Sequence, residues 1–254
     1  MASFEGVIGA SAVLIGGIGI FWNGFYKFYK KRLIENTPTS KIRSIAMGMV
    51  EINGKAVPPQ GKVLTGLLSG DKCVYYRYAV EERKTDSKGR QYWTAIDRGE
   101  KRAHFYVKDE TGTVLLDPTG AEVDIPVDFT HTLSEGRKTP ATIVQYMVSK
   151  KINPKQFFFG YRPLRFTEWH IAPGDNLYVL GTAGSNPFKT KAVRNEEGAM
   201  IAKGKGTFVI SDSSEKEILG KYKWQVPLQL FGGAALIVGG LWFLMQVITF
   251  LNGS

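Results

Sequence analysis

The hydrophobic pattern of this chain contains two long apolar segments, one near each end. They are Val7–Trp22 and Val226–Leu251, and neither contains a charged residue. A helix rises about 1.5 Å per residue, so the second segment would be roughly 39 Å long, more than the ~30 Å hydrocarbon core of a bilayer. The first would be roughly 24 Å long, and Asn23–Tyr29 extends it at the interface. We therefore predict transmembrane helices over residues 4–29 and 226–251.

The alternatives to transmembrane helices are a buried core helix and a signal peptide. A core helix is usually apolar on one face, whereas both segments are apolar on all sides. A signal peptide begins with basic residues and ends in small ones. Here Met1–Glu5 has no Lys or Arg, and the first segment ends in an aromatic and basic flank, Phe21–Lys27. Both comparisons favour helices that stay in the membrane.

Basic residues flank both apolar segments on the side of the intervening region. Lys27–Arg32 contains four of them, and Lys221 and Lys223 precede the second segment. Because basic flanks mark the cytoplasmic side, we predict a cytoplasmic central domain with both termini on the opposite side. The membrane would be the cell membrane in a prokaryote or an organelle membrane in a eukaryote. The same cations would lie near anionic headgroups, so the lipid bilayer is a predicted partner.

The net charge of +10 raises the question of nucleic-acid binding. Away from the membrane flanks, charges of both signs are interspersed rather than clustered, which is typical of a solvated surface. No basic and aromatic motif of the nucleic-acid-binding type is present. We therefore expect no nucleic-acid partner.

The region between the apolar segments, residues 33–220, has mainly the two-residue period of β-strands. Ile42–Val50 is a β-prone run followed by Asn53–Gly54, a strong hairpin signal. Cys73–Val80 is rich in aromatic and β-branched residues, and turn residues occupy Asp109–Gly112 and Pro173–Asp175. The pattern predicts a mainly β, antiparallel, barrel-like soluble domain with one or two helices, flanked by the two transmembrane helices.

Helix signals in the domain are few. Thr139 is placed as an N-cap before Pro140, which would open a helix over Ala141–Lys151. Ser214 and Glu217 have the spacing of a capping box, which predicts a short helix leading into the second transmembrane segment.

Small residues indicate that the two apolar helices pack together. Ala12 and Gly16 form a small-xxx-small pair in the first segment, and Ala235 and Gly239 form one in the second. Further close-approach points are expected at Gly17, Gly19, Gly232, Gly233 and Gly240. Gly is also common in membrane helices that do not pack against each other through it, so the sequence leaves open whether the two helices are in contact.

Candidate catalytic residues are few. Cys73, the only cysteine, could be a nucleophile or a thioester carrier, but at the start of an apolar strand it is expected to be a buried hydrophobe. His104, His131 and His170 are far apart and lack metal-ligand spacing. Each is expected to be an ordinary strand or turn residue.

Two further patterns carry weak chemical signals. Asp124 and Asp128 flank Pro126 and could be paired carboxylates, although surface charge is the simpler interpretation. Lys203–Gly206 is Gly-rich but has neither P-loop nor dinucleotide-binding spacing. We therefore predict no catalytic, cofactor-binding or metal-ligating residue and no cofactor.

Several of these segments, taken in order, resemble a known family. They are Cys73–Tyr78, Glu81–Glu82, Asp109–Gly112, Asp117–Pro118, Gly120–Ala121, Glu168, Pro173–Asp175, Leu177–Gly181, Phe208–Asp212 and Ser214–Glu215. The series resembles the GIDE domain family, the "beside a membrane" module of MULAN-type mitochondrial E3 ubiquitin ligases, which also occurs in prokaryotic membrane proteins. The resemblance implies a domain held between two membrane helices.

The resemblance stops short of the ligase chemistry. The ligases carry a RING finger after the second membrane helix, and a RING needs seven or eight Cys and His ligands for two zinc ions. This sequence has one Cys and three His. We therefore expect a prokaryotic-like member without a RING finger.

Three functions fit these observations. The favoured one is a membrane-tethered protein-interaction module that binds another membrane or membrane-proximal protein. The alternative is an enzyme, either related to E3 ubiquitin-protein transferases or an unrecognised hydrolase. The third is recognition of lipid headgroups by the basic flanks. The sequence favours a protein that is not an enzyme.

Overall fold

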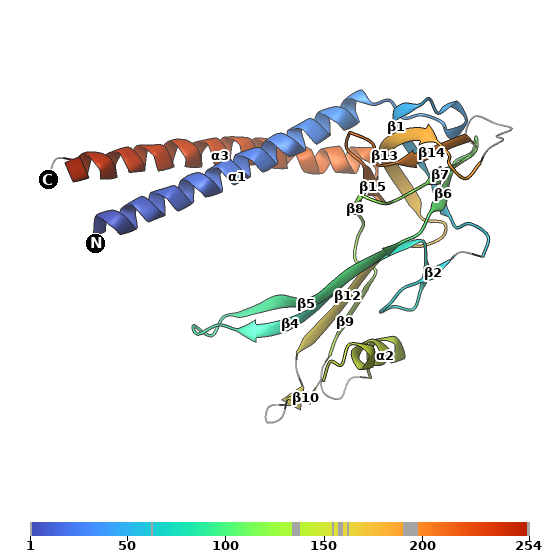
Figure 1. Cartoon of the computed structure of the whole chain (residues 1–254), viewed down its shortest axis with the longest axis horizontal. Coiled ribbons are helices and arrows are strands. Elements are labelled where there is room, and N and C mark those ends of the chain that lie inside the picture. Colours follow the sequence, from blue (N-terminus) through green and yellow to red (C-terminus); the bar gives the residue numbers. More distant parts are fainter. Residues whose placement is uncertain are drawn as a thin grey trace. The chain divides into compact units, whose positions relative to one another are not determined.

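The computed structural model describes residues 2–61, 63–133, 138–153, 155–156, 160–161, 163–189 and 198–252. The chain divides into two compact units (Figure 1). The helical unit comprises Met1–Pro38 and Ser214–Ser254, and the β unit comprises Thr39–Ser213.

The helices are α1 (Ala2–Asn36), α2 (Ala141–Ser149) and α3 (Glu215–Asn252), with a short 3-10 helix, η1 (Ile42–Ser44). The strands are β1 (Gly48–Val57), β2 (Leu64–Thr65), β3 (Lys72–Cys73), β4 (Tyr75–Thr85), β5 (Gln91–Arg102), β6 (Phe105–Lys108), β7 (Thr113–Leu116), β8 (Glu122–Asp124), β9 (Phe129–Thr132), β10 (Lys155–Gln156), β11 (Gly160–Tyr161), β12 (Leu164–Ile171), β13 (Asn176–Ser185), β14 (Ala199–Ala202) and β15 (Val209–Ser211). The fold class is the predicted one: a β-rich domain with a barrel, and a long apolar helix at each end of the chain.

The helical unit is an antiparallel pair in which glycines bring α1 and α3 together (Figure 1). A Cβ atom added to Gly17 would lie 2.9 Å from Leu236 Cβ, and one added to Gly24 would lie 2.9 Å from Gln229 Cβ. As the residue number rises along α1, the number of the residue that it contacts in α3 falls, as antiparallel packing requires. The predicted packing of the two helices is therefore confirmed.

Six buried positions of this pair, away from the ends near the β unit, recur every seven residues. Ala10, Gly17 and Gly24 are buried in α1, as are Val226, Gly233 and Gly240 in α3. A seven-residue repeat is typical of left-handed packing at a small crossing angle.

The small residues named in the sequence are partly correct: Gly17, Gly233 and Gly240 lie in the helix contact, whereas the two small-xxx-small pairs, Gly19 and Gly232 do not. Ala12, Gly16, Ala235 and Gly239 are exposed, and nothing lies within 4 Å of a Cβ added to Gly16 or Gly239. The Gly17 and Gly240 positions, one residue along each helix, face the partner instead. A small-xxx-small pattern does not say which of several glycines lies in the interface, because one residue is a 100° rotation about the helix axis.

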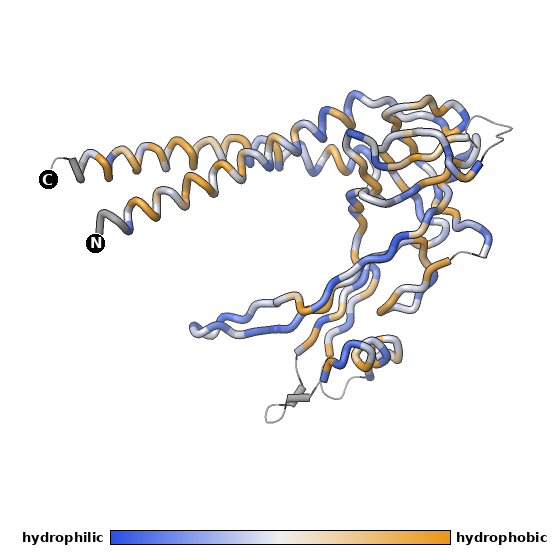
Figure 2. Tube along the Cα trace, in the orientation of Figure 1, coloured by the Kyte–Doolittle hydropathy of each residue, from blue (hydrophilic) through white to orange (hydrophobic). Residues whose placement is uncertain are grey.

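Apolar residues predominate along α1 and α3 away from their ends near the β unit (Figure 2). Both helices are long and apolar enough to cross a membrane, over Glu5–Asn36 and Glu215–Thr249. Only 11 % of the most apolar window of each helix is buried, and Trp22 and Phe231 are 73 % and 77 % exposed. A soluble core helix would bury these side chains, so the exposed apolar surface supports membrane association.

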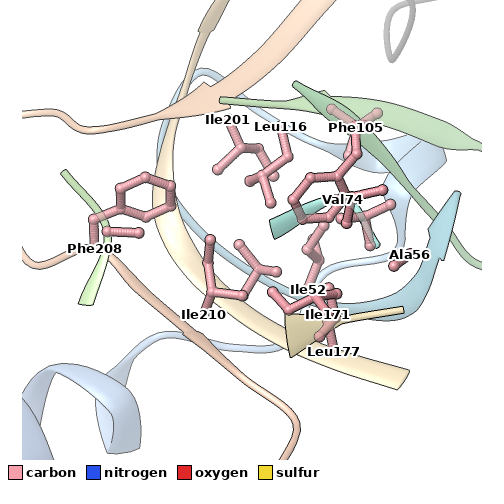
Figure 3. Packing of buried hydrophobic residues seen from close by; sticks show 14 of the residues in the cluster. Ile52, Ala56, Val74, Phe105, Leu116, Ile171, Leu177, Ile201, Phe208 and Ile210 are labelled. Carbon is pink, nitrogen blue, oxygen red and sulfur yellow. The ribbon is translucent and has the colours of Figure 1, made fainter. Parts of the chain in front are cut away.

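Five strands of the β unit close into a barrel. The order is β1-β6-β7-β14-β13, and β1 pairs again with β13 to close the ring. These pairs are antiparallel except β7–β14, which is parallel. Strand β15 continues the sheet from β13, and β8 lies beside it in parallel. Buried aliphatic and aromatic side chains such as Ile52, Phe105 and Ile210 fill the interior (Figure 3).

The predicted hairpin at Asn53–Gly54 is wrong, since both residues lie inside β1. The strand pairs with β13 up to Lys55 and with β6 from Lys55 onward. A Cβ atom added to Gly54 would lie 2.7 Å from the carbonyl oxygen of Lys108 in β6. The glycine therefore allows a close strand approach at the barrel corner rather than a turn. The predicted β-prone run over Ile42–Val50 is also partly wrong, because Ile42–Ser44 is helical and β1 begins only at Gly48.

A second sheet of four strands has the order β5-β4-β12-β9. On one of its faces lie Val80, Leu164 and Phe166, which form a core with Ile143 and Met147 of α2. Strand β12 ends at Ile171, and Pro173–Asp175 then turns the chain into β13 of the barrel. The β5–β6 and β8–β9 links also connect the two sheets. The backbone N–H of Gly174 and the carbonyl of Asp175 both bond to Ala56 of β1.

The predicted helix starts are partly correct. The Ser214 and Glu217 capping box is confirmed, because the Ser214 N–H donates to Glu217 Oε2 at 2.9 Å and the Glu217 N–H to Ser214 Oγ at 3.4 Å. This helix is not short, since α3 continues from Glu215 through Pro227 to Asn252. At α2 the N-cap is Pro140, not Thr139, and no side chain caps the helix.

Replacing Gly233 by Ala should weaken the helix pair. The added Cβ would lie 2.6 Å from the backbone nitrogen of Phe21. Such overpacking costs about 1–3 kcal/mol, which exceeds the ~1 kcal/mol that Ala adds in helix propensity. We expect a lower thermal midpoint for the full-length protein in detergent micelles.

The matched control for this substitution is Gly239→Ala, in the same helix with open space around the added atom. Its thermal midpoint should stay unchanged or rise. Equal effects of the two substitutions would contradict the glycine contact between α1 and α3.

Candidate functional site

A polar cavity of about 270 Å³ lies in the β unit where the two sheets meet. Its walls come from the β8–β9 link, the end of β12, the start of β13 and the residue after β15. The polar side chains that line it are Asp128, His170, Asp175, Asn176 and Asp212. Because three carboxylates and an imidazole line it, this cavity is the first candidate for a catalytic site.

Two of the three carboxylates in the cavity accept hydrogen bonds from backbone N–H groups. Asp128 Oδ2 accepts the His170 N–H at 2.8 Å, and Asp175 Oδ2 accepts the Ala172 N–H at 2.7 Å. His170 Nδ1 is 3.9 Å from Asp128 Oδ2 and 4.0 Å from Glu168 Oε1, too far for a hydrogen bond. No Ser, Cys, Thr or Lys side chain is among the residues that line the cavity. The cavity therefore offers a proton acceptor without an adjacent nucleophile.

The structure does not bring the three histidines together as ligands. His170 lines the cavity, His131 lies in β9, and His104 lies 3.7 Å from Asp117 Oδ2 and packs edge-on against Phe188. Among the described residues, no group of three His, Cys, Asp or Glu side chains is placed to hold a metal ion.

The two weaker sequence patterns lie in different places. Asp128 lines the cavity, whereas Asp124 belongs to β8, and its carbonyl accepts the Ser211 hydroxyl at 2.8 Å. Lys203–Gly206 is part of the β14–β15 link. A Cβ atom on Gly204 would collide with Thr182 of β13, so this glycine serves close packing of the loop on the barrel.

Cys73 is fully buried at the end of β3. Burial, reinforced by the negative charges of Glu168 and Asp71, raises the pKa of the thiol to about 12. A thiol with this pKa is protonated at neutral pH and is not a nucleophile or thioester carrier. The expectation of a buried cysteine is confirmed, and its lack of reactivity stays a prediction.

Glu168 is a fully buried carboxylate whose role the sequence did not reveal. Its oxygens accept the Leu68 N–H at 2.8 Å, the Ser69 N–H at 3.3 Å and the Ser69 hydroxyl at 2.5 Å. The carboxylate therefore holds the β2–β3 loop against β12. Such hydrogen bonds offset the cost of burying a charge, so Glu168 has a structural role.

A second buried network fixes α2 to the four-stranded sheet. Asp97 Oδ2 of β5 accepts the Tyr146 hydroxyl and lies 2.9 Å from Lys150 Nζ. Desolvation opposes ionisation of Asp97, but the bonds from Lys150 and Tyr146 outweigh it and lower its pKa. The same contact raises the pKa of Tyr146, after desolvation as the larger cause. Asp97 is therefore ionised and committed to structure.

The face of the four-stranded sheet opposite α2 carries arginines and tryptophans. The strand registers place Arg77 beside Trp169, Arg83 beside Trp93, and Arg165 across from Glu81. Arg98 lies on the same face beside Ala79. We call these residues the Arg–Trp face: Arg77, Arg83, Arg98, Arg165, Trp93 and Trp169.

The guanidinium groups of this face lie over the indole rings. Arg165 Cζ is 4.4 Å and Arg83 Cζ is 6.0 Å from the centre of the Trp93 ring. Arg77 Cζ is 4.7 Å from the centre of the Trp169 ring. Cation–π contacts of this kind hold the arginine side chains flat on the sheet. Two of these guanidinium groups are also bonded within the chain: Arg77 Nη1 donates to the Val123 carbonyl at 3.2 Å, and Arg165 Nε donates to Glu81 Oε2 at 2.8 Å.

Strand β5 forms one edge of the same sheet (Figure 1). It has 12 residues and pairs with β4, and in the described part of the chain it pairs with no other strand. A bulge at Ile96 interrupts the register between Val80 and Glu81 of β4. The Arg98 N–H is taken by Asp97 Oδ1 at 3.0 Å. The free edge therefore extends from Gln91 to the bulge.

The sequence profile of the GIDE family, described as E3 ubiquitin ligase, matches residues 75–244. The match covers more than half of the chain, and the chain belongs to this family. It begins at β4 and ends within α3, so it includes the four-stranded sheet and the Arg–Trp face. No curated protein and no solved structure matches the chain.

Cys73 should resist alkylation in the folded protein. Its burial and its pKa of about 12 leave neither access nor thiolate for N-ethylmaleimide at pH 7.5. Mass spectrometry should find the folded chain unmodified over a period in which the denatured chain is fully modified. Rapid labelling of the folded protein would contradict the buried position.

Proposed function

We propose that this chain is a two-span membrane protein whose β unit binds a protein partner beside the bilayer. The observation that carries this proposal is the free edge of β5, in a domain joined at both of its ends to apolar helices. An unpaired strand edge offers backbone N–H and C=O groups that an extended partner segment can complete.

The chemistry of the described residues supports binding over catalysis. The cavity beside His170 has no nucleophile among its lining residues, and Cys73 is buried and protonated. Glu168 and Asp97, the carboxylates with the most contacts, are used in structural hydrogen bonds. Within the Arg–Trp face, Arg83 and Arg98 are exposed, and in the described part of the chain neither guanidinium group has an ion pair or hydrogen bond, whereas Arg77 and Arg165 are bonded to Val123 and Glu81.

The proposal includes an orientation, with the β unit in the cytoplasm and both termini on the opposite side. The antiparallel helix pair puts both chain termini at one end of the helical unit. The basic residues Lys27, Lys31 and Lys221 lie toward the other end, where they would meet cytoplasmic headgroups.

Reporter fusions test this orientation. In a bacterial host, alkaline phosphatase fused after Ser254 should be active, because that enzyme matures only outside the cytoplasm. Green fluorescent protein inserted in the exposed Asp86–Arg90 turn of the β4–β5 hairpin should fluoresce. An inactive phosphatase at the C-terminus would reverse the orientation.

Site-specific photocrosslinking tests the binding role. A benzophenone amino acid at Tyr92 of β5 should yield a discrete crosslinked protein in intact cells, because this position lies on the free edge. The same amino acid at Lys55, an exposed position of the barrel, is the control and should yield no such product. Identical products, or none from the β5 position, would contradict the proposal.

A role in ubiquitin transfer is the second candidate, and the family description favours it. The single cysteine and three histidines of this sequence are too few for the zinc ligands of a RING. In this role the zinc-binding module would lie outside residues 1–254. Capture of a RING protein or a ubiquitin-conjugating enzyme at β5 would favour this candidate.

A further inference from the structure

We propose that the Arg–Trp face and the adjoining β5 edge bind an acidic, extended segment of a protein partner. The segment adds to the sheet as a strand beside β5, with carboxylates over the arginines. This inference rests on the proposed protein-binding function and names the chemistry of the partner.

Charge is the first argument for an acidic partner. Five arginines lie on this face of the sheet: Arg77, Arg83, Arg98, Arg102 and Arg165. The two glutamates among them are already paired, Glu81 with Arg165 at 2.8 Å and Glu100 with Arg102 at 2.8 Å. Arg83 and Arg98 are exposed, and the glutamates two residues from them on this face, Glu81 and Glu100, are the ones already paired with Arg165 and Arg102. The uncompensated positive charge of the face therefore lies at Arg83 and Arg98, on and beside β5.

The stacking of the arginines is the second argument. Arg83 and Arg165 lie against the Trp93 ring, so the ring face is covered and the charged groups are oriented before any ligand arrives. Glu81 already bonds Arg165, so Arg83 is the stacked group left for a ligand. A preorganised guanidinium loses less entropy on binding, and its planar edge matches the two oxygens of a carboxylate. The covered indole is poorly placed to insert among lipid headgroups.

The free strand edge selects a polypeptide among anionic ligands. Gln91–Ile96 of β5 offers main-chain hydrogen bonds that a lipid headgroup or a nucleic acid cannot complete as a continuous ladder. Because side chains alternate along a strand, every second residue of an added segment would lie on the Arg–Trp face. The residues between them would lie on the other face, where Tyr92 is 49 % exposed. The expected segment thus alternates acidic with apolar residues.

The test uses the full-length protein in phosphatidylcholine nanodiscs and a fluorescein-labelled peptide in which glutamate alternates with valine and threonine. Fluorescence anisotropy should show saturable binding that weakens as salt is raised. The Arg83→Glu/Arg98→Glu variant should bind at least tenfold more weakly. Lys55→Glu/Lys203→Glu, the same charge change at two exposed barrel positions, should bind as the unmodified protein does. A peptide with glutamine in place of glutamate should bind at least tenfold more weakly.

Three results would overturn the inference. These are no binding of the acidic peptide, equal loss in the barrel control, and face-dependent binding of phosphatidylserine vesicles or oligothymidylate in place of the peptide. The resistance of Cys73 to N-ethylmaleimide shows whether each variant is folded. If the Arg83→Glu/Arg98→Glu variant is not folded, Arg83→Gln/Arg98→Gln is measured in its place, and its affinity should also fall at least tenfold. If the peptide does not bind but photocrosslinking at β5 still captures a protein, the acidic partner is wrong and the binding function stands.

Discussion

Where Gly17 and Gly24 of α1 meet α3, the helices are so close that one added methyl group would collide with the opposing chain. This contact gives the chain a helical hairpin with an apolar outer surface, and it requires the two ends of the sequence to come together. In lipid there is little hydrophobic drive between helices, so close packing of small residues is the main source of attraction. The domain between the helices is consequently connected to the hairpin at both of its ends.

Within the β unit, buried carboxylates hold segments that hydrophobic packing alone leaves loose. Glu168 fixes the β2–β3 loop, and Glu51 accepts hydrogen bonds from Thr39 at 2.6 Å and Tyr178 at 2.7 Å. These groups are costly to bury and are therefore satisfied by several donors. On one face of the four-stranded sheet, by contrast, Arg83 and Arg98 are exposed, and their guanidinium groups have no ion pair among the described residues. This division between internal and outward charge is the physical basis for assigning the sheet a binding role.

The sequence predicted features whose cause is local. The turn at Asp109–Gly112 could be predicted because Asp109 Oδ1 accepts the N–H groups of Thr111 and Gly112, two and three residues away. The capping box at Ser214 is local for the same reason. Gly54 was mistaken for a turn because its neighbour, the Lys108 carbonyl, is distant in sequence. The Arg–Trp face could not be found, because it requires the register of β4 with both β5 and β12, including the bulge opposite Val80 and Glu81.

The membrane role of this protein depends on lipid, rather than water, being the solvent around α1 and α3. Extraction of isolated membranes with sodium carbonate at high pH removes proteins held only by surface charge or by other proteins. Helices with apolar side chains such as Phe231 on their outer surface should keep the full-length chain in the membrane pellet. Release of the chain into the supernatant would show that these helices do not span a bilayer, and it would contradict the central claim.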